Sequence, residues 1–329
     1  MISSDLQEGA GEVLECIRDR NCVAWIGSGL TMENGYPDWP KSLRCLCEAC
    51  GIPPLALGEA PTADKLLDKA EECKRKRRAA YEGTLAELYG RKSYGSRLAL
   101  HQLMRLGFRG YITTNFDPLL VQVEETHGIG DLWVYPNFAV ASLGKDRPPV
   151  FHIHGLARLG DQQRGDNLIL ARSDFDEAYG PGGIVQGFLE QVLTHHSVVF
   201  WGCRLSEPVM YEVFRRVHDI LLRIEQTGRG APTPKRYMLA PKPTRRVNKD
   251  IAQQTEIDLI TQDAERDAES QLLEERRRLS DMGIQAIWYS PNDPPRHRAV
   301  DEFLEYLCKL DGMPVSQLPT VDLVERVSA

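Results

Sequence analysis

The strongest constraint in the sequence is the alternation of short apolar runs with amphipathic stretches along most of its 329 residues. The apolar runs are rich in β-branched and aromatic residues and lack strict polar alternation, which is typical of strands buried on both faces. They span Cys22–Ile26, Gly110–Thr114, Pro149–Ile153, Ser197–Trp201, Arg236–Ala240 and Ile284–Tyr289. Strands that alternate with helices predict an α/β fold with a doubly wound, Rossmann-like parallel sheet.

The amphipathic stretches between these runs predict the helices of that fold. They span Asp5–Arg20, Ser96–Leu106, Pro118–Thr126, Gly183–His195, Glu207–Ile224 and His297–Leu310. Between Ile52 and Ser96 the sequence contains helical material and no convincing strand. We therefore expect a sheet domain from residues 1–51 and 97–311, a helical insertion at 52–96, and a C-terminal tail at 312–329.

Composition excludes several classes of protein. The chain has 40 Lys+Arg against 47 Asp+Glu, a net charge of −7, which argues against a general nucleic-acid coat because phosphate neutralisation needs a basic excess. Apolar runs are too short for a membrane-spanning helix, and the N-terminus is acidic, unlike a signal peptide. These features predict a cytoplasmic protein whose eight cysteines are reduced thiols.

Two charged segments and one cysteine cluster have structural as well as functional interpretations. The basic run Lys74–Arg78 is more typical of a solvated helix face than of a polynucleotide site. The mixed-charge segment 248–281 predicts an exposed helix with ion pairs four residues apart, or an assembly surface. Cys45 and Cys47 fall in a predicted helix, where positions two apart diverge by about 200°, so we expect no metal site there.

A glycine-rich loop, Gly27-Ser28-Gly29-Leu30-Thr31, follows the first predicted strand directly. Glycines at the end of a strand let backbone N–H groups approach a phosphate, so the loop is a candidate anion site. It does not match the dinucleotide fingerprint, whose third glycine would fall at Met32, and it lacks the lysine of a Walker A motif. Taken alone, the loop is equally well interpreted as a structural turn.

Several blocks in order resemble the sirtuin family. The glycine loop is followed by Gly35-Tyr36-Pro37-Asp38-Trp39, and together they resemble the sirtuin signature. The block Thr113–Asp117 (TTNFD) resembles the sirtuin T-x-N-x-D block, and His152–Gly155 (HIHG) resembles the block that ends in the catalytic His-Gly. Downstream, Gly202–Pro208 (GCRLSEP) resembles a turn of bacterial sirtuin-like domains. The resemblance covers about residues 21–310.

The resemblance implies NAD+ as substrate, bound in a crevice at the carboxyl ends of the strands, which is also where open α/β sheets generally bind ligands. It implies that Asn115 and His154 are catalytic, with Asn115 and Asp117 facing the nicotinamide ribose. The glycine loop would line the pyrophosphate and Gly202 would approach the cofactor. The cofactor-binding residues implied in this way are Gly27, Ser28, Gly29, Thr31, Asp38, Trp39, Asn115, Asp117, Gly155, Gly202 and Ser206.

The chemistry of NAD+ cleavage suits Asn115 and His154. An amide holds a ribose hydroxyl or a water molecule without adding charge, and a neutral imidazole accepts a proton from it. His152 lies two residues before His154 and shares its face of the strand, but a hydrogen-bonded core histidine is the favoured interpretation. Asp117 precedes Pro118 and can cap the following helix, contact the cofactor, or do both.

Two departures from the sirtuin pattern bear on the reaction. No cysteine occurs between Gly155 and Trp201, where protein-deacylating sirtuins carry zinc-binding pairs, so we expect no zinc ribbon and no metal. The final arginine of the signature is replaced by Pro40. The Pro40 change implies that the mobile cofactor loop works differently. The missing zinc module puts the acyl-lysine groove in doubt, which favours water as the acceptor.

The resemblance is therefore to zinc-free sirtuin-like NAD+ hydrolases of bacterial anti-phage systems. It implies an effector that depletes NAD+, activated by homo-oligomerisation or by a sensor such as a HerA-type DNA-translocating ATPase or an Argonaute-like protein. Little direct contact with nucleic acid is expected. Two alternatives remain at this stage, an NAD-dependent protein deacylase and a non-catalytic nucleotide-sensing or scaffold subunit.

Overall fold

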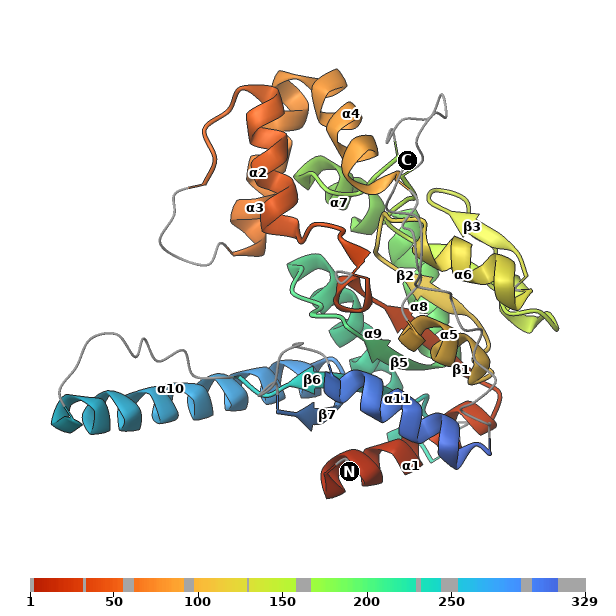
Figure 1. Ribbon diagram of the computed structural model, residues 1–329. Coiled ribbons are helices and arrows are strands. Elements are labelled where there is room, and N and C mark those ends of the chain that lie inside the picture. Colours follow the sequence, from red (N-terminus) through yellow and green to blue (C-terminus); the bar gives the residue numbers. More distant parts are fainter. Residues whose placement is uncertain are drawn as a thin grey trace, which may run out of the picture.

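The computed structural model describes residues 3–31, 34–55, 62–91, 98–128, 130–157, 167–228, 232–243, 254–290 and 298–312. Within these ranges the chain forms one seven-stranded sheet with helices on both faces (Figure 1). Every neighbouring pair of strands is parallel, in the order β3-β4-β2-β1-β5-β6-β7. The strands are β1 Cys22–Ile26, β2 Tyr111–Thr113, β3 Leu132–Val134, β4 Val150–His152, β5 Ser197–Trp201, β6 Arg236–Pro241 and β7 Gln285–Tyr289.

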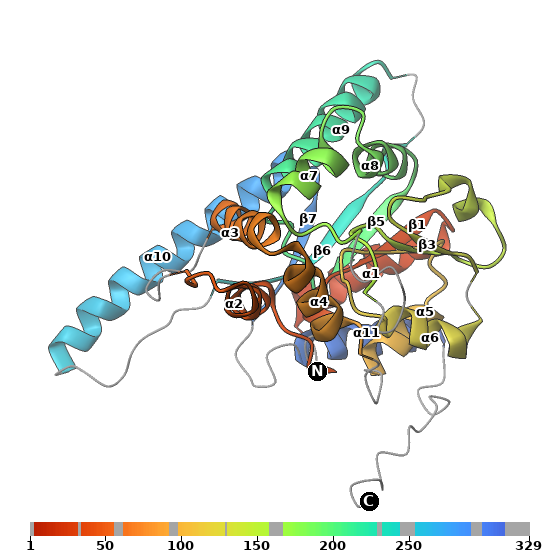
Figure 2. The same cartoon turned by 90° about the horizontal axis from the view of Figure 1, so that it is seen from above.

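Helices cover the two faces of the sheet in two groups (Figure 2). One face packs against α1 Ser4–Arg18, α5 Leu98–Arg105, α6 Leu119–His127 and α11 Arg298–Leu310. The other packs against α7 Arg172–Tyr179, α8 Ile184–His195, α9 Pro208–Gln226 and the end of α10 Gln254–Asp281. Because side chains alternate along each strand, Ala24 lies in the first core and Trp25 in the second.

The predicted doubly wound sheet is confirmed. The bounds of the six apolar runs agree with those of β1, β2, β4, β5, β6 and β7 to within one or two residues. Two runs, Cys22–Ile26 and Ser197–Trp201, coincide with β1 and β5. The sequence interpretation missed β3 and α7. β3 has three half-buried residues at the edge of the sheet, so it lacks the continuous apolar run that burial on both faces produces.

A group of helices covers the carboxyl end of part of the sheet (Figure 1). It consists of α2 Trp39–Cys50, α3 Ala63–Lys76 and α4 Arg78–Tyr89, which pack against one another. The last two fall in the predicted insertion, whose residues 56–61 and 92–97 lie outside the described residues. Because α2 precedes that segment, the group is wider than the insertion, and the boundaries at 52–96 stay a prediction.

Ion pairs join this helical group to α7. The Arg172 guanidinium lies 2.8 Å from the Asp64 carboxylate and 2.5 Å from that of Asp68, both on α3. Lys74, the first residue of the basic run, pairs with Asp174 on α7. At least this part of the run therefore has an intramolecular role.

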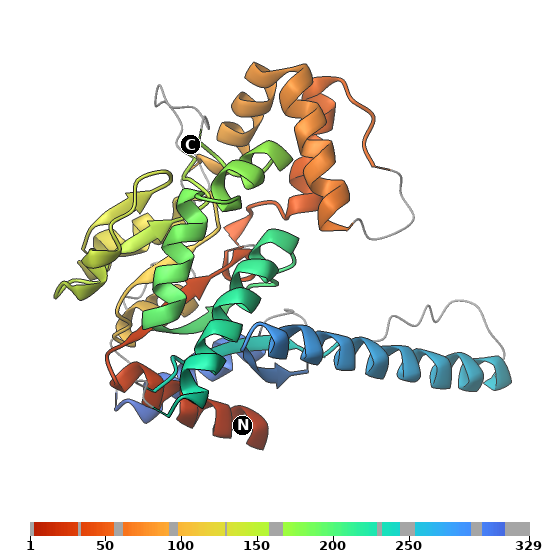
Figure 3. The ribbon, with the colours of Figure 1, turned by 180° about the vertical axis from the view of Figure 1, so that it is seen from behind.

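Helix α10 extends away from the body of the molecule in each view (Figure 3). Its presence confirms the helix predicted within the mixed-charge segment. Residues 244–253 and the predicted tail beyond residue 312 lie outside the described residues. None of the described helices combines the length and apolar character that crossing a membrane requires.

The loop after β1 and the turn after β5 meet through backbone hydrogen bonds. The Gly27 N–H donates to the Trp201 carbonyl at 2.8 Å, and the Gly29 N–H donates to the Gly202 carbonyl at 3.0 Å. A Cβ on Gly27 would lie 2.5 Å from the Gly202 oxygen. Gly202 has φ +64°, and its own Cβ would lie 2.7 Å from the Leu30 nitrogen. Only glycines permit so close an approach.

We therefore expect Gly202→Ala to be strongly destabilising. The matched control is Gly51→Ala, because Gly51 has a similar φ of +63° but open space around its Cβ position. Both variants incur left-handed backbone strain, and only Gly202→Ala adds steric overlap. In chemical denaturation, the free energy of unfolding should fall by at least about 2 kcal/mol more in Gly202→Ala than in the control. Equal losses would mean that the close contact is unimportant.

Candidate active site

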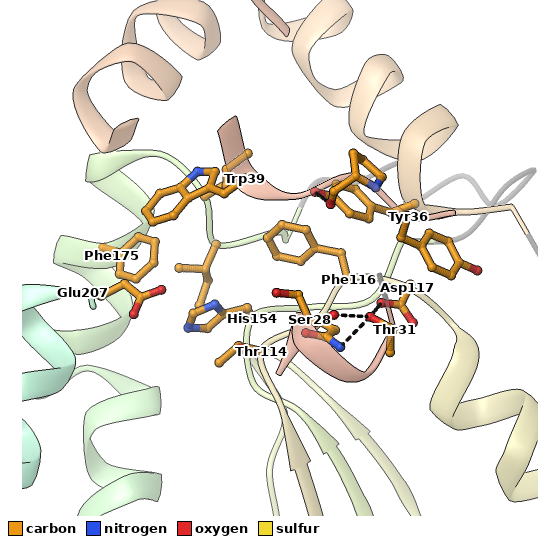
Figure 4. Close-up of a pocket in the computed structure, with 15 residues that line it drawn as sticks. Ser28, Thr31, Tyr36, Trp39, Thr114, Phe116, Asp117, His154, Phe175 and Glu207 are labelled. Atoms are coloured by element: carbon orange, nitrogen blue, oxygen red, sulfur yellow. Dashed lines mark hydrogen bonds between the residues drawn. The ribbon is translucent and has the colours of Figure 1, made fainter. Parts of the chain in front are cut away.

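A cavity opens at the carboxyl ends of β1, β2 and β4, below the helical group (Figure 4). Its walls combine aromatic rings with a small number of polar side chains, as is usual for ligand sites. It is lined by Ser28, Thr31, Tyr36, Pro37, Trp39, Tyr89, Thr114, Asn115, Phe116, Asp117, His154, Ile169, Leu170, Phe175 and Glu207.

Three buried polar residues form a connected network at the floor of the cavity. The Asn115 Nδ2 donates to the Thr31 hydroxyl at 3.1 Å, and that hydroxyl donates to Asp117 Oδ2 at 3.1 Å. Asn115 is 8% exposed and Asp117 is 3% exposed, so these hydrogen bonds satisfy groups that are costly to bury alone. The network fixes the orientation of the Asn115 amide within the cavity.

The ends of β1 and β2 are joined by a threonine below this network. The Thr113 hydroxyl donates to the Ile26 carbonyl at 2.8 Å and accepts the Asn115 N–H at 3.0 Å. A single side chain thus ties the glycine loop to the strand end that carries Asn115. The geometry explains why a β-branched hydroxyl residue ends β2.

Asp117 both caps a helix and faces the cavity. Its Oδ1 accepts the Leu119 N–H at 3.2 Å, at the start of α6. Burial raises the pKa of Asp117 to about 6, although the hydrogen bonds from Leu119 and Thr31 act in the opposite direction. The two interpretations of Asp117 as a cap and as a site residue are therefore compatible.

His154 is enclosed by aromatic side chains from α7. Its Nε2 lies 2.5 Å from the Tyr179 hydroxyl, and its ring contacts Phe175 edge-on with centroids 5.2 Å apart. The residue is 4% exposed, and burial lowers its pKa to about 3. The imidazole is therefore neutral near pH 7, which is the form that accepts a proton.

His152 has a different role from His154. It is fully buried, and its Nδ1 lies 3.1 Å from the Asn115 carbonyl oxygen. It does not line the cavity. This is the arrangement expected of a core histidine that supports the strand end.

Comparison with known families matches part of the chain. Residues 109–260 match the family model described as SIR2-like domain. This segment of the chain is therefore similar to a SIR2-like domain. The matched segment includes Asn115, Asp117, His154 and Gly202.

Solved Sir2 structures resemble the whole chain distantly. A Sir2 homologue in complex with NAD is 14% identical, with 91% of this chain and 94% of that chain covered and a TM-score of 0.37. A structure of a Sir2 enzyme bearing on mechanism and regulation is 10% identical, with 94% and 100% covered and a TM-score of 0.38. No curated protein matches the sequence.

The structure brings some of the predicted site residues of the SIR2-like domain together and leaves others apart. Ser28, Thr31, Trp39, Asn115, Asp117 and His154 line the cavity. Gly27, Gly29 and Gly202 instead pack against one another as described above. The remaining positions are Asp38, Gly155 and Ser206. Asp38 and Gly155 have local structural roles, and Ser206 lies away from this cavity.

Asp38 is exposed and caps α2, accepting the Lys41 N–H at 2.9 Å. Gly155 has φ +92°, and a Cβ there would lie 2.4 Å from the Asn167 oxygen, so the turn after β4 requires glycine. Ser206 is exposed and lines a second cavity. These three predictions are neither confirmed nor contradicted by the structure.

The second cavity lies at the carboxyl ends of β5, β6 and β7, against α9 and α10. It contains the Trp288 and Tyr211 rings, two carboxylates, Glu274 and Glu275, and Arg278. Arg278 is engaged with Glu275 at 2.6 Å and donates to the Leu205 carbonyl at 2.7 Å. The β5 turn separates this cavity from the first.

Sequence reasoning missed three cavity or support residues, Phe175, Tyr179 and Glu207. Phe175 and Tyr179 lie on α7, whose contact with His154 depends on tertiary packing. Glu207 lies in the Gly202–Pro208 block that resembles a turn of bacterial sirtuin-like domains, but an acidic residue before Pro208 is also typical of an ordinary helix start, so the pattern alone does not assign it to the site. Among the described residues, no group of three or more His, Cys, Asp or Glu side chains is arranged to hold a metal ion.

We expect Asp117 to make the stability of the SIR2-like domain depend on pH. Its folded pKa of about 6 exceeds the ordinary value of 3.8, so its contribution is fully present below pH 3.8 and is lost as the pH rises through 6. As the pH rises from about 4 to 7, the free energy of unfolding of Asp117→Asn should therefore increase by roughly 2–3 kcal/mol relative to that of wild type. Urea denaturation across this range measures the difference.

The control for this experiment is Asp176→Asn, at an exposed carboxylate on α7. The depressed pKa of His154 destabilises the protein in acid, but that effect is common to all three proteins and cancels in the difference. A difference between Asp117→Asn and wild type that does not change with pH would show that Asp117 is not held in a raised-pKa state.

Proposed function

We propose that this protein is an NAD+ glycohydrolase, converting NAD+ and water to ADP-ribose and nicotinamide. The observation that carries the proposal is the convergence of Asn115, His154 and the Thr31–Asp117 pair on one cavity. These side chains come from the ends of three strands, of which β2 and β4 fall in the segment that matches the SIR2-like domain. Perturbed titratable groups that converge in a cleft are characteristic of catalytic sites.

The position of the cavities suits a dinucleotide. β1 lies between β2 and β5, where the strands that follow it in sequence divide between the two halves of the sheet, and open α/β sheets bind nucleotides at such a switch point. The first cavity lies on the β2 side of this point and the second on the β5 side. We infer that NAD+ spans the β5 turn, with nicotinamide in the first cavity and adenosine in the second.

The first cavity suits the nicotinamide end by its chemistry. Nicotinamide in NAD+ is a flat cationic ring, and the walls offer the aromatic rings of Trp39, Phe116 and Phe175. Two carboxylates, Asp117 and Glu207, complement the positive charge. The second cavity offers Trp288 and Tyr211 as apolar surfaces for a base.

The reaction breaks the bond between ribose C1′ and the nicotinamide nitrogen, and its electron pair goes to the leaving ring. Water then adds to C1′ and loses a proton. Asn115 orients the ribose hydroxyl or the attacking water, and the neutral His154 imidazole accepts the proton. Closure of the aromatic walls keeps bulk water from the cationic sugar.

We further propose water as the acceptor and antiviral defence as the context. The stretch from Gly155 to Trp201 contains no cysteine for the zinc module of a protein deacylase. A role as an NAD+-depleting effector in the cytoplasm, activated by homo-oligomerisation or by a HerA-type or Argonaute-like partner, is supported by the sequence resemblance. The projecting helix α10 is a candidate surface for either kind of assembly.

The proposal predicts release of nicotinamide and ADP-ribose from NAD+ in the absence of any acylated peptide, measured by chromatography. Asn115→Ala and His154→Ala should each lower the turnover at least about 100-fold, because each removes a group needed for water activation. The control is His195→Ala, at an exposed histidine that ends α8 outside the cavity.

The assay should be run on the protein alone, at high concentration, and with candidate partner proteins. Turnover that requires an acyl-lysine peptide would establish a deacylase instead. Absence of turnover under all of these conditions would favour a nucleotide-sensing or scaffold role. Turnover that survives both substitutions would refute the assignment of the site.

A further inference from the structure

Glu207 is a carboxylate in the wall of the first cavity whose presence the fold does not explain. It stands immediately before α9 and lines the cavity together with His154 and Phe175 (Figure 4). Its side chain makes no capping hydrogen bond to α9. Glutamate is also not among the residues preferred at this position, so capping does not account for it.

The carboxylate lacks a cationic partner within the described part of the chain. No ion pair joins Glu207 to a described lysine, arginine or histidine side chain. The Arg278 charge acts on it from a distance, but that guanidinium is bound to Glu275 and to backbone carbonyls. The local N–H groups of Ser206 and Glu207 are its hydrogen-bonding neighbours.

Glu207 is half-buried, and removing a carboxylate from water without a countercharge is costly, so its burial raises the pKa of Glu207. Such a cost is offset when a cation enters the cavity. The side chain next to Glu207 is the aromatic Phe175, and His154 in the same wall is neutral. The Glu207 side of the cavity therefore has the negative charge and the aromatic surface that favour binding of a cation.

We propose that Glu207 is a further catalytic residue, whose carboxylate faces the positive charge that develops on the ribose as the nicotinamide bond breaks. The inference rests on the proposed NAD+ hydrolysis. In that step the C1′–N bond electrons go to nicotinamide, and the sugar becomes an oxocarbenium-like cation before water adds and its proton is lost. A fixed anion in a water-poor cavity stabilises such a cation strongly.

This assignment separates the tasks of the two walls. Asn115 and His154 act on the oxygen nucleophile and its proton, and Glu207 acts on the charge of the sugar. Because nicotinamide leaves as a neutral molecule, it needs no acid, so an anionic residue beside the bond does not hinder its departure. Glu207 also favours the cationic nicotinamide ring in the bound substrate, since that charge is one bond from C1′.

The test compares Glu207→Gln, which removes the charge with little change of shape, with Glu207→Asp, which retains it. Glu207→Gln should lower kcat about 100-fold and raise KM only about five- to tenfold, because most of the stabilised charge belongs to the transition state. Glu207→Asp should recover at least about tenfold of the loss. The control is Glu225→Gln, at an exposed position on α9, with thermal unfolding measured for every variant.

A binding measurement gives a readout independent of turnover. Carbocyclic NAD+, which keeps the cationic ring but is not cleaved, and NADH, whose ring is neutral, are titrated by calorimetry. Wild type should prefer the cationic ligand, and Glu207→Gln should reduce that preference about fivefold or more. If Glu207 had only a structural role, Glu207→Gln would lower the affinity for both ligands equally.

The outcomes distinguish this inference from the proposed function. If wild type hydrolyses NAD+ and Glu207→Gln keeps kcat within threefold, the role of Glu207 is overturned and the hydrolase stands. If wild type does not hydrolyse NAD+ in any form, the hydrolase falls and with it the catalytic role of Glu207. The binding preference then decides whether Glu207 recognises the cation, and an unchanged preference overturns that as well.

Discussion

The structure depends on the backbone contact between the loop after β1 and the turn after β5. These strands belong to the two halves of the sheet, and their ends approach closely because Gly27, Gly29 and Gly202 have no side chains. The contact uses the N–H groups of Gly27 and Gly29 for the fold itself. Ser28, between the two glycines, and Thr31, two residues after Gly29, line the cavity. The glycine pattern therefore has a structural cause that is independent of any ligand, and its consequence is a crevice at the switch point of the sheet.

Burial of polar groups determines the chemistry of that crevice. The same desolvation that raises the pKa of Asp117 lowers that of His154, so both groups are biased toward their neutral forms. A core assembled only for stability would replace them by apolar side chains, since each buried polar group costs free energy unless it is paired. Thr31 and Tyr179 provide hydrogen bonds without supplying a countercharge. The result is a cavity with fixed dipoles and unneutralised carboxyl groups, which is suited to a cationic ligand.

The strands that are buried on both faces could be predicted from the sequence, because such strands are continuous apolar runs. β1 and β5 are continuous apolar runs, whereas β3 is a half-buried edge strand whose pairing with β4 cannot be seen locally. The assignment of Asn115 and His154 to the site followed from the resemblance of the Thr113–Asp117 and His152–Gly155 blocks to sirtuins. Their partners did not, because the Tyr179 hydroxyl reaches His154 from 25 residues away through the docking of α7. Contacts of this kind depend on tertiary packing rather than on local pattern.

Helix α7 connects the helical group above the cavity to the side chain that is proposed to accept the proton. Its first turn binds α3 through Arg172, while Phe175 and Tyr179 on the same helix enclose His154. Ion pairs at the surface contribute little to stability. We therefore interpret the Arg172 ion pairs as contacts that fix the position of α7 relative to α3. A displacement of α3 that carried α7 with it would also move the aromatic wall around the imidazole. The orientation of His154 is consequently coupled to the placement of the helices that cover the cavity.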